Sequence, residues 1–278
     1  MKLRRRLLDR ALIGLSLAAV VIAIVPLLSI VYDVTAKGLP AINPSFFTQL
    51  PPLADTPGGG LGNAVQGTLI LISLSALIGI PIGLLSGIYT SEYGSNWYGS
   101  TVRFLGDVLA GIPSIVTGVL VYALVVIPLH AFSFLAGSVA LGTMMIPIVS
   151  NTSHQALKSV PNSIREASTA LGSRRWKTTL EVVVNAKGSI ATACLLAVSR
   201  IAGETAPLIL TAGGISTQWY AGLNEPAASL TNYVYYFGTS PFANWKDLAW
   251  GAALILMVIV LGINIVVRIV TREKRAYS

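Results

Sequence analysis

The sequence predicts an all-α integral membrane protein with six transmembrane helices. Hydrophobic residues make up 54% of its 278 residues and charged residues only 11%, whereas soluble domains carry roughly 25% charged residues. The apolar residues occur in long blocks, which is typical of membrane-spanning helices. The net charge is +8. Because the positive residues flank the apolar blocks, they indicate membrane topology and not binding to nucleic acid.

Each apolar block is close to the ~20 residues that a helix needs to cross the hydrocarbon core. The predicted spans are residues 11–32, 64–90, 104–128, 132–150, 189–212 and 248–270. The first span follows the basic segment MKLRRRLLDR, so a cleaved signal peptide is an alternative. We favour a retained anchor, because the apolar run is long and no clear small-x-small cleavage site follows it.

The distribution of Lys and Arg predicts the orientation of the chain. Five lie in the amino-terminal segment, six in residues 151–188, four in the carboxyl-terminal tail, and Arg103 lies between the second and third spans. The other side carries Lys37 and Lys246. By the positive-inside rule, both termini and residues 151–188 lie in the cytoplasm.

Two segments on the predicted outer side differ from the spans. Residues 33–63 are rich in Pro and Gly and predict a loop, ordered or mobile. Residues 213–247 are rich in aromatic side chains: Trp219, Tyr220, Tyr233, Tyr235, Tyr236, Phe237 and Trp245. We favour an aromatic belt at the membrane interface, and the alternative is a docking surface or gate lid for an external partner.

The cytoplasmic segment between the fourth and fifth spans predicts two helices joined by a turn. Ser163 and Glu166 fit a capping box that begins a helix ending near Leu171. Gly172 suits the left-handed position after that helix, and Ser173 suits the N-cap of the next one. The second helix carries apolar residues at helical spacing, namely Trp176, Leu180, Val183 and Val184. An alternative is an amphipathic pair that lies on the membrane without a partner.

Charged residues inside predicted spans are candidate functional residues. Arg200 and Glu204 lie four residues apart in the span 189–212, which places them on one face of a continuous helix. A charge at bilayer depth costs at least about 2.5 kcal/mol. Arg200 is predicted about 16 Å from the start of the span, near the bilayer centre, where its planar guanidinium suits a tetrahedral oxyanion.

A second charged pair lies at the start of the third span. Arg103 and Asp107 are also four residues apart, and their boundary position favours a local ion pair or a cytosolic contact over a substrate site. Pro113 and Ser114 follow, and they suit a bend of this span, although a proline in a membrane helix is often merely tolerated.

Four stretches resemble one family of transporters. Glu166-Ala167-Ser168 followed by Gly172 is similar to the EAA loop of binding-protein-dependent ABC importer permeases, although Val182-Val183-Val184-Asn185 replaces the family's Ile-x-Leu-Pro. The other stretches are GGGLGNAVQGTLIL (58–71), LAGIPSIVTGVLVY (109–122) and SRIAGETAPLILTAGG (199–214). Together they resemble the A-type permease subunits of phosphate ABC importers.

The resemblance implies a type I ABC permease fold over residues 64–270, preceded by residues 1–63 and followed by a cytoplasmic tail, 271–278. It implies a multi-pass protein of the inner or plasma membrane of a bacterium or archaeon, forming half of a pathway for inorganic phosphate. The loop at about 155–188, with Glu166, Ala167, Ser168 and Gly172, would couple to an ATPase. The implied partners are a second homologous permease, two ATPase subunits and an extracytoplasmic phosphate-binding protein.

The same resemblance suggests roles for Arg200 and Glu204 in the substrate pathway. Glu204 either neutralises Arg200 while the site is empty or accepts a hydrogen bond from protonated phosphate, and both alternatives remain open. The sequence has no G-x-x-x-x-G-K-[ST] motif, no catalytic cluster and no metal-ligand cluster. We therefore expect a transport subunit and not an enzyme, with ATP-Mg on a separate chain. The alternatives are a type I permease for molybdate or sulfate, or a secondary transporter, which would need internal repeats.

Overall fold

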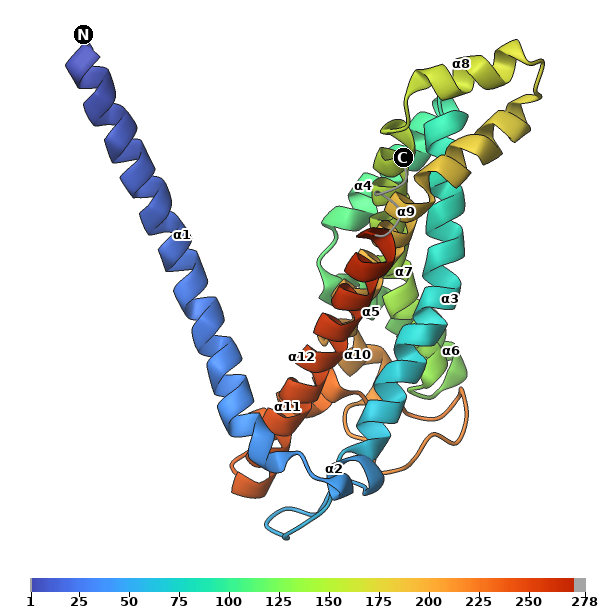
Figure 1. Ribbon diagram of the computed structural model, residues 1–278. Helices are drawn as coiled ribbons and strands as arrows, with labels where there is room; N and C mark the ends of the chain where they lie inside the picture. The colour runs from blue at the N-terminus through green and yellow to red at the C-terminus, as the bar shows by residue number, and fades with distance from the viewer. Residues whose placement is uncertain (1, 273–278) are drawn as a thin grey trace.

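The computed structural model describes residues 2–272, and the elements of this part of the chain are helices (Figure 1). Five of them are long and apolar enough to cross a membrane, and a bent helix pair, α4 (Trp97–Gly111) with α5 (Ser114–Val121), adds a sixth span if it is counted as one. The five are α1 (Lys2–Gly38), α3 (Gly62–Glu92), α7 (Phe134–Lys158), α9 (Arg175–Ala202) and α12 (Ala243–Arg272). Residues 273–278 of the predicted tail lie outside the described residues.

Helices α3 and α7 form the centre of the bundle, and small residues bring them close together. An added Cβ at Gly79 would lie 2.6 Å from Met145 Cβ, and one at Gly83 would lie 2.7 Å from Val149 Cβ. Gly87, one turn further on, also faces α7. Glycines at a spacing of four let two membrane helices approach closely and gain van der Waals contact.

The third predicted span is bent at Pro113 and Ser114, as the sequence suggests, and the bend breaks the helix. Helix α4 ends at Gly111, Ile112 is extended with ψ 130°, and α5 begins at Ser114 after a bend of 104°. The cause is Pro113, because a proline ring disfavours helical backbone at the residue before it. A π-helical turn (η2, Tyr122–Val126) and a short helix (α6, Ile127–Leu129) complete this segment.

The fifth predicted span, residues 189–212, is wrong at both ends. Helix α9 already begins at Arg175, so the cytoplasmic segment runs into the span without interruption. It ends at Ala202, and three residues then lead to α10 (Ala206–Leu208) and a π-helical turn, η3 (Ile209–Gly213). In a continuous helix the ring of Pro207 would clash with the carbonyl group of residue 203, which explains why α9 ends before it.

Short elements and ordered loops cap the end of the bundle opposite α8 (Figure 1). Phe46, Tyr233 and Phe237 are buried there, and Trp245 stacks on Phe237 with ring centroids 4.4 Å apart. The aromatic-belt interpretation is therefore wrong for Tyr233 and Phe237, which form a core. The capping elements are η1 (Leu39–Ala41), α2 (Pro44–Thr48) and α11 (Leu230–Gly238).

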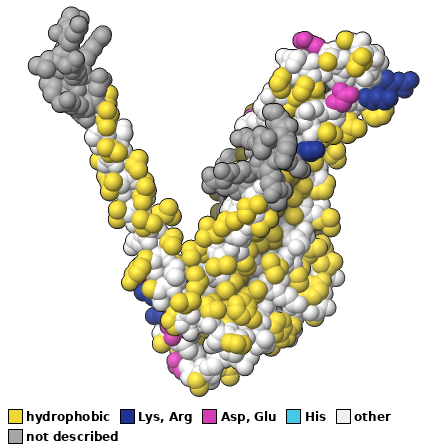
Figure 2. Space-filling view, viewed as in Figure 1, with side chains coloured by type: hydrophobic (Ala, Val, Ile, Leu, Met, Phe, Trp, Pro, Cys, Tyr) yellow, Lys and Arg dark blue, Asp and Glu magenta, His cyan; other side chains and the backbone are white. Residues whose placement is uncertain are grey.

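Helix α1 stands apart from the bundle over most of its length and meets α12 near its own carboxyl end (Figure 1). At that contact, Lys37 Nζ lies 4.7 Å from the centre of the Trp250 ring. Apolar side chains from Leu12 to Tyr32 are exposed, and Figure 2 shows hydrophobic side chains along α1 and over the visible face of the bundle. Such a surface needs lipid or another protein to cover it.

The two ends of the bundle correspond to the two predicted sides of the membrane. The amino-terminal end of α1, the turn that follows α8 (Asn162–Ala170) and the carboxyl-terminal end of α12 lie toward one end in Figure 1. The cap formed by α2 and α11 lies at the other end. This arrangement is compatible with the orientation that the Lys and Arg distribution predicts, and the orientation itself stays a prediction.

Cysteine labelling tests that orientation. In a Cys194→Ala background, we expect Ser163→Cys to react with a membrane-impermeant maleimide only after cells are permeabilised, because the exposed Ser163 lies on the predicted cytoplasmic side. Asn224→Cys, in an exposed outer loop, should react in intact cells. Asn232 is unsuitable for this purpose because its side chain is fully buried. The reverse pattern would show that the topology is inverted.

Candidate functional site

The end of α9 holds the two charged residues that the sequence places at membrane depth. Arg200 lies in the last turn, and its carbonyl oxygen accepts a hydrogen bond from the Gly203 N–H at 3.3 Å. Glu204 follows the helix and donates its N–H to the carbonyl oxygen of Ile201 at 3.0 Å. The prediction that Arg200 and Glu204 share one face of a continuous helix is therefore wrong.

Arg200 faces away from the core of its own chain. Its side chain is exposed and that of Glu204 is partly buried. In the part of the chain that the structure describes, ion pairs join Lys37 to Asp33 and Arg165 to Glu92, and none joins Arg200 to Glu204. The preceding residue joins this part of α9 to α12, because Ser199 Oγ donates to Asn264 Oδ1 at 3.2 Å. A positive charge is thus held on the outside of this single chain.

The broken segments of the third and fifth predicted spans meet a few residues after the end of α9. An added Cβ at Gly118 of α5 would lie 2.8 Å from Pro207 Cα of α10, so these two short helices are in close contact. Both lie between the ends of α3 and not at either end of the bundle (Figure 1). Irregular backbone at membrane depth is tolerated where protein buries it or where it lines a water-filled cavity. The region around Arg200 is therefore the candidate site for an anion that crosses the membrane.

A helical hairpin projects at the other end of α9. Helix α8 leads through a tight turn into α9. Gly172 in this turn has a φ of +75°, the left-handed conformation that was predicted for it, and its N–H donates to the carbonyl oxygen of Thr169 at 2.9 Å. The predicted caps are wrong: the N-cap residues are Pro161 and Arg174, and no side chain caps either helix.

The predicted coupling residues of the hairpin divide into two groups. Glu166 and Ala167 are exposed. Ser168 is 3% exposed, and its hydroxyl group lies 2.9 Å from that of Thr178, a hydrogen bond that ties α8 to α9. Glu166 and Ala167 are therefore available to a partner, whereas Ser168 holds the two helices of the hairpin together.

The amino-terminal part of α9 presents an apolar surface outward. The side of α9 that faces the bundle carries Thr178, Val182, Ala186 and Ile190, which are all buried. The other side carries the outward surface. Trp176 and Leu180 are each 56% exposed, and Leu171 at the turn is 86% exposed. Figure 2 shows Lys and Arg side chains at the tip of the same hairpin. An exposed apolar patch with a charged rim is typical of a protein-binding surface.

An ion pair that the sequence analysis missed fixes this hairpin to the bundle. Arg165 on α8 donates from Nε and Nη2 to the two carboxylate oxygens of Glu92, at 3.1 and 2.8 Å. It also donates to the carbonyl oxygens of Leu157 and Val160, at 3.0 and 2.9 Å. The hydrogen bonds to Glu92 raise the pKa of Arg165, so its charge is permanent. The pair joins the ends of α3 and α7 to α8.

The ion pair predicted at the start of the third span is not formed among the described side chains. Arg103 donates to the carbonyl oxygen of Gly94 at 3.3 Å, and Asp107 accepts a hydrogen bond from Asn151 at 3.1 Å. Asp107 thus joins α4 to α7, and Arg103 turns toward the end of α3.

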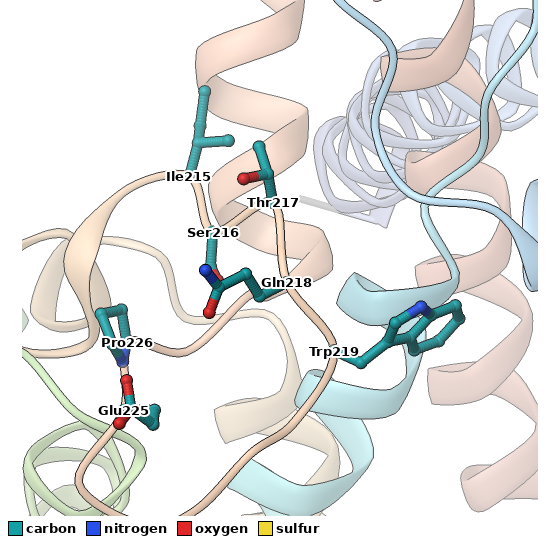
Figure 3. A pocket seen from close by; sticks show the side chains of 7 residues that line it. All are labelled: Ile215, Ser216, Thr217, Gln218, Trp219, Glu225 and Pro226. Atoms are coloured by element: carbon teal, nitrogen blue, oxygen red, sulfur yellow. The ribbon is translucent and has the colours of Figure 1, made fainter.

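The outer loops line an open pocket of about 300 Å³ next to the capping elements. Figure 3 shows Ile215 to Trp219 along one loop segment, with Glu225 and Pro226 on another. The pocket has a rigid wall, because the carbonyl oxygen of Ser216 accepts hydrogen bonds from Asn63 and from the Tyr233 hydroxyl group. This is an ordered outer surface, which suits the docking alternative for Trp219 and its neighbours.

A membrane-spanning bundle with broken helices around an arginine, and an exposed hairpin at one end, defines a transmembrane transport subunit. The family described as "binding-protein-dependent transport system inner membrane component" matches residues 79–275. A phosphate transport system permease protein, PstA, of Yersinia pestis is 40% identical over 274 residues, covering 98% of this chain and 92% of the relative. A probable PstA of Methanocaldococcus jannaschii is 33% identical over 270 residues, 97% of this chain and 95% of the relative.

Solved structures agree with this assignment at the level of the fold. A chain of a bacterial alginate ABC transporter, in complex with a pentasaccharide-bound periplasmic protein, matches with a TM-score of 0.67 at 18% identity, covering 95% of both chains. A chain of the inward-facing MetNI methionine ABC transporter matches with a TM-score of 0.62 at 17% identity, covering 76% of this chain and 95% of that one. The chain belongs to the family of binding-protein-dependent transport system inner membrane components, and it is a transport subunit and not an enzyme.

Proposed function

We propose that this chain is a permease subunit of an ATP-driven importer of inorganic phosphate and that it forms half of the translocation pathway. The observation that carries the proposal is Arg200, a permanent positive charge held outside the chain's own core beside two helix breaks. Relatives at 40% identity over nearly the whole chain are phosphate transport permeases by name. The family description and the fold fit a subunit that works with a separate ATPase, which would bind ATP-Mg.

The chemistry of phosphate matches the two charged side chains. A guanidinium donates two parallel hydrogen bonds to an oxyanion, which favours Arg over Lys for a tetrahedral anion. Glu204 is partly buried in the connection after α9 and forms no ion pair with Arg200 within the described residues. An ionised carboxylate is only an acceptor, so Glu204 selects for an anion that still carries a proton. Inorganic phosphate at neutral pH carries one or two protons, and sulfate carries none.

The partners we propose are a second homologous permease, two ATPase subunits and an extracytoplasmic phosphate-binding protein. The exposed side chain of Arg200 suits a pathway that the second permease completes. The surface formed by Leu171, Trp176 and Leu180 suits the ATPase. The outer loops around Trp219 suit the binding protein, and the setting is the inner or plasma membrane of a bacterium or archaeon.

Uptake by the reconstituted complex tests the substrate. We expect vesicles that contain the complete transporter to accumulate labelled phosphate when ATP and the binding protein are supplied. Excess sulfate or molybdate should leave the rate unchanged. Uptake of sulfate or molybdate in preference to phosphate would assign the protein to the transport of another oxyanion.

Replacing Gly172 tests the hairpin as the ATPase contact. We expect Gly172→Val to weaken retention of the ATPase, because the left-handed conformation costs a β-branched residue at least about 1–2 kcal/mol. The space around Gly172 is open, so the cost comes from the backbone and not from a clash. Gly188→Val is the matched control, with equally open space in a regular helix. The measurement is the ATPase that co-purifies with each variant, and full retention by Gly172→Val would contradict the proposal.

A further inference from the structure

A basic pocket lies beside the hairpin, next to the ends of α3, α7, α8 and α9. A pocket of about 370 Å³ is lined there by residues of α3, α4, α7, α8 and α9, together with the loop after α3. We propose that this pocket binds a phosphate group, supplied either by an anionic phospholipid headgroup or by free inorganic phosphate. The residues that carry the argument are Ser91, Glu92, Arg103, Lys158, Arg165 and Arg175.

The pocket has an excess of positive charge that its own residues do not neutralise. Four cationic side chains line it, and Glu92 is the one carboxylate among the described lining residues. Glu92 is already engaged in its ion pair with Arg165. Arg103, Lys158 and Arg175 are exposed, and none of them has an ion-pair partner within the described residues. Three uncompensated cations around one hollow favour an anion such as a phosphate group.

Existing contacts aim two of these cations toward the pocket. Arg103 donates to the carbonyl oxygen of Gly94 at 3.3 Å. Arg175 donates to the carbonyl oxygen of Glu92 at 2.7 Å and lies 4.6 Å from the centre of the Tyr93 ring. A guanidinium has five N–H donors, so each arginine keeps several free for an anion. The two side chains are therefore positioned before any ligand binds.

Two helix N-termini add donors at the same place. Asn162 is the first residue of α8 and Arg175 the first residue of α9, and both line the pocket. Neither helix has a side-chain cap, so their first backbone N–H groups lack that partner. The positive end of a helix dipole favours an anion. These N-termini add to the electrostatic attraction of an anion, most of which comes from the basic side chains.

The aromatic residues beside the pocket place it at the depth of lipid headgroups. Trp97 and Tyr98, at the start of α4, are 79% and 58% exposed, and the Tyr98 ring packs edge-on against Tyr89 at 5.5 Å. Trp and Tyr concentrate where the membrane meets water. Basic pockets between helices at this boundary on the cytoplasmic side bind anionic headgroups.

The pocket is separate from the proposed translocation site. Arg175 and Arg200 are at opposite ends of α9, 25 residues apart, which corresponds to about 38 Å along a straight helix. An anion in the pocket therefore cannot contact Arg200. The proposal stands whether or not phosphate is the transported substrate.

Native mass spectrometry of the assembled transporter tests the pocket, with phosphatidylglycerol added in one arm and phosphatidylcholine as the neutral control. We expect Lys158→Gln to weaken phosphatidylglycerol binding about fivefold, the effect of about 1 kcal/mol per basic residue near a membrane surface. Lys158 forms no ion pair or side-chain hydrogen bond within the described residues, so its loss spares the fold. Lys187→Gln removes one exposed charge from α9 outside the pocket and should have no effect.

A second arm measures equilibrium binding of labelled inorganic phosphate in an Arg200→Gln background, which removes the proposed pathway site. Binding that Lys158→Gln weakens and Lys187→Gln leaves intact would assign the pocket to free phosphate, whereas the same pattern with phosphatidylglycerol assigns it to a headgroup. The proposal is overturned if neither probe binds, or if the two lysine variants behave alike. Phosphate uptake by Lys158→Gln vesicles is measured in parallel, so that failure of the pocket and failure of the transport proposal can be distinguished.

Discussion

Arg200→Gln should abolish phosphate uptake in vesicles while the complete transporter still assembles. The side chain is exposed on a single chain and holds no ion pair among the described residues, so its removal breaks no contact of the fold. Its loss leaves an anion at membrane depth without a counter-charge, which costs at least about 2.5 kcal/mol and lowers the rate by about two orders of magnitude. The measurement is labelled phosphate uptake normalised to assembled complex.

A conservative variant at this position and a control variant elsewhere complete the experiment. Arg200→Lys should restore only a small fraction of uptake, because an ammonium group cannot form the bidentate contact. Lys246→Gln, which removes an exposed charge at the start of α12, is the matched control and should transport normally. Uptake at the normal rate by Arg200→Gln would show that the anion does not use this side of α9.

Glu204→Gln separates the two roles left open for the carboxylate. If Glu204 selects phosphate by accepting a hydrogen bond from its proton, the variant should lose this selection. The glutamine amide can donate a hydrogen bond to an unprotonated oxygen, so sulfate should then compete with phosphate for uptake. If Glu204 only balances charge, sulfate competition should stay absent and assembly or release should suffer instead. Uptake across a series of sulfate concentrations therefore distinguishes selection from charge balance.

Arg165→Met should release the hairpin from the bundle and cause loss of the ATPase. It leaves the Glu92 carboxylate, whose side chain is 8% exposed, without its charged partner. Breaking such a pair from one side costs about 3 kcal/mol or more. The carbonyl oxygens of Leu157 and Val160 lose their donors as well. We expect little ATPase to co-purify and the hairpin to become sensitive to protease.

The double variant Arg165→Met with Glu92→Met is the control for that experiment. Replacing both members of a buried ion pair by apolar residues is often close to neutral, because no uncompensated charge remains. Protease resistance of the hairpin should therefore recover in the double variant. If the single and double variants are equally sensitive, the hydrogen bonds to Leu157 and Val160 matter more than the ion pair.

The sequence predicts the number and type of the spans well, because a span depends mainly on local hydropathy. It also predicts the bend at Pro113, but hydropathy alone does not explain why prolines elsewhere leave a helix continuous. Pro81 and Pro147 lie inside the continuous helices α3 and α7, whereas Pro113 and Pro207 follow helix ends. A proline in a membrane helix is tolerated where neighbouring groups satisfy the freed backbone, and that depends on packing and not on local sequence.

The candidate site shows the same division between local and long-range information. Gly172 was predictable because a tight turn after a short helix calls for a left-handed residue. The pair of Arg165 with Glu92 was not, because 73 residues separate its members. A usable signal was present nonetheless: Glu92 is an acidic residue directly after a predicted span, on the side where basic residues gather. Such a residue needs a partner, and the basic cytoplasmic segment supplies it.

Helix α9 runs for 28 residues from the hairpin turn to the turn that holds Arg200, a length of about 42 Å. Sharp kinks in helices occur at prolines and similar interruptions, and α9 has no internal proline. A displacement of its first turn is therefore transmitted to its last turn. Only Gly203, Glu204 and Thr205 separate α9 from α10, which is in close contact with α5. A movement of the hairpin along α9 therefore carries Arg200 with it, and these three residues absorb the part that α10 does not follow. The connection Gly203–Thr205 is thus the joint between α9 and α10, and lengthening it should let α9 and Arg200 move without moving α10.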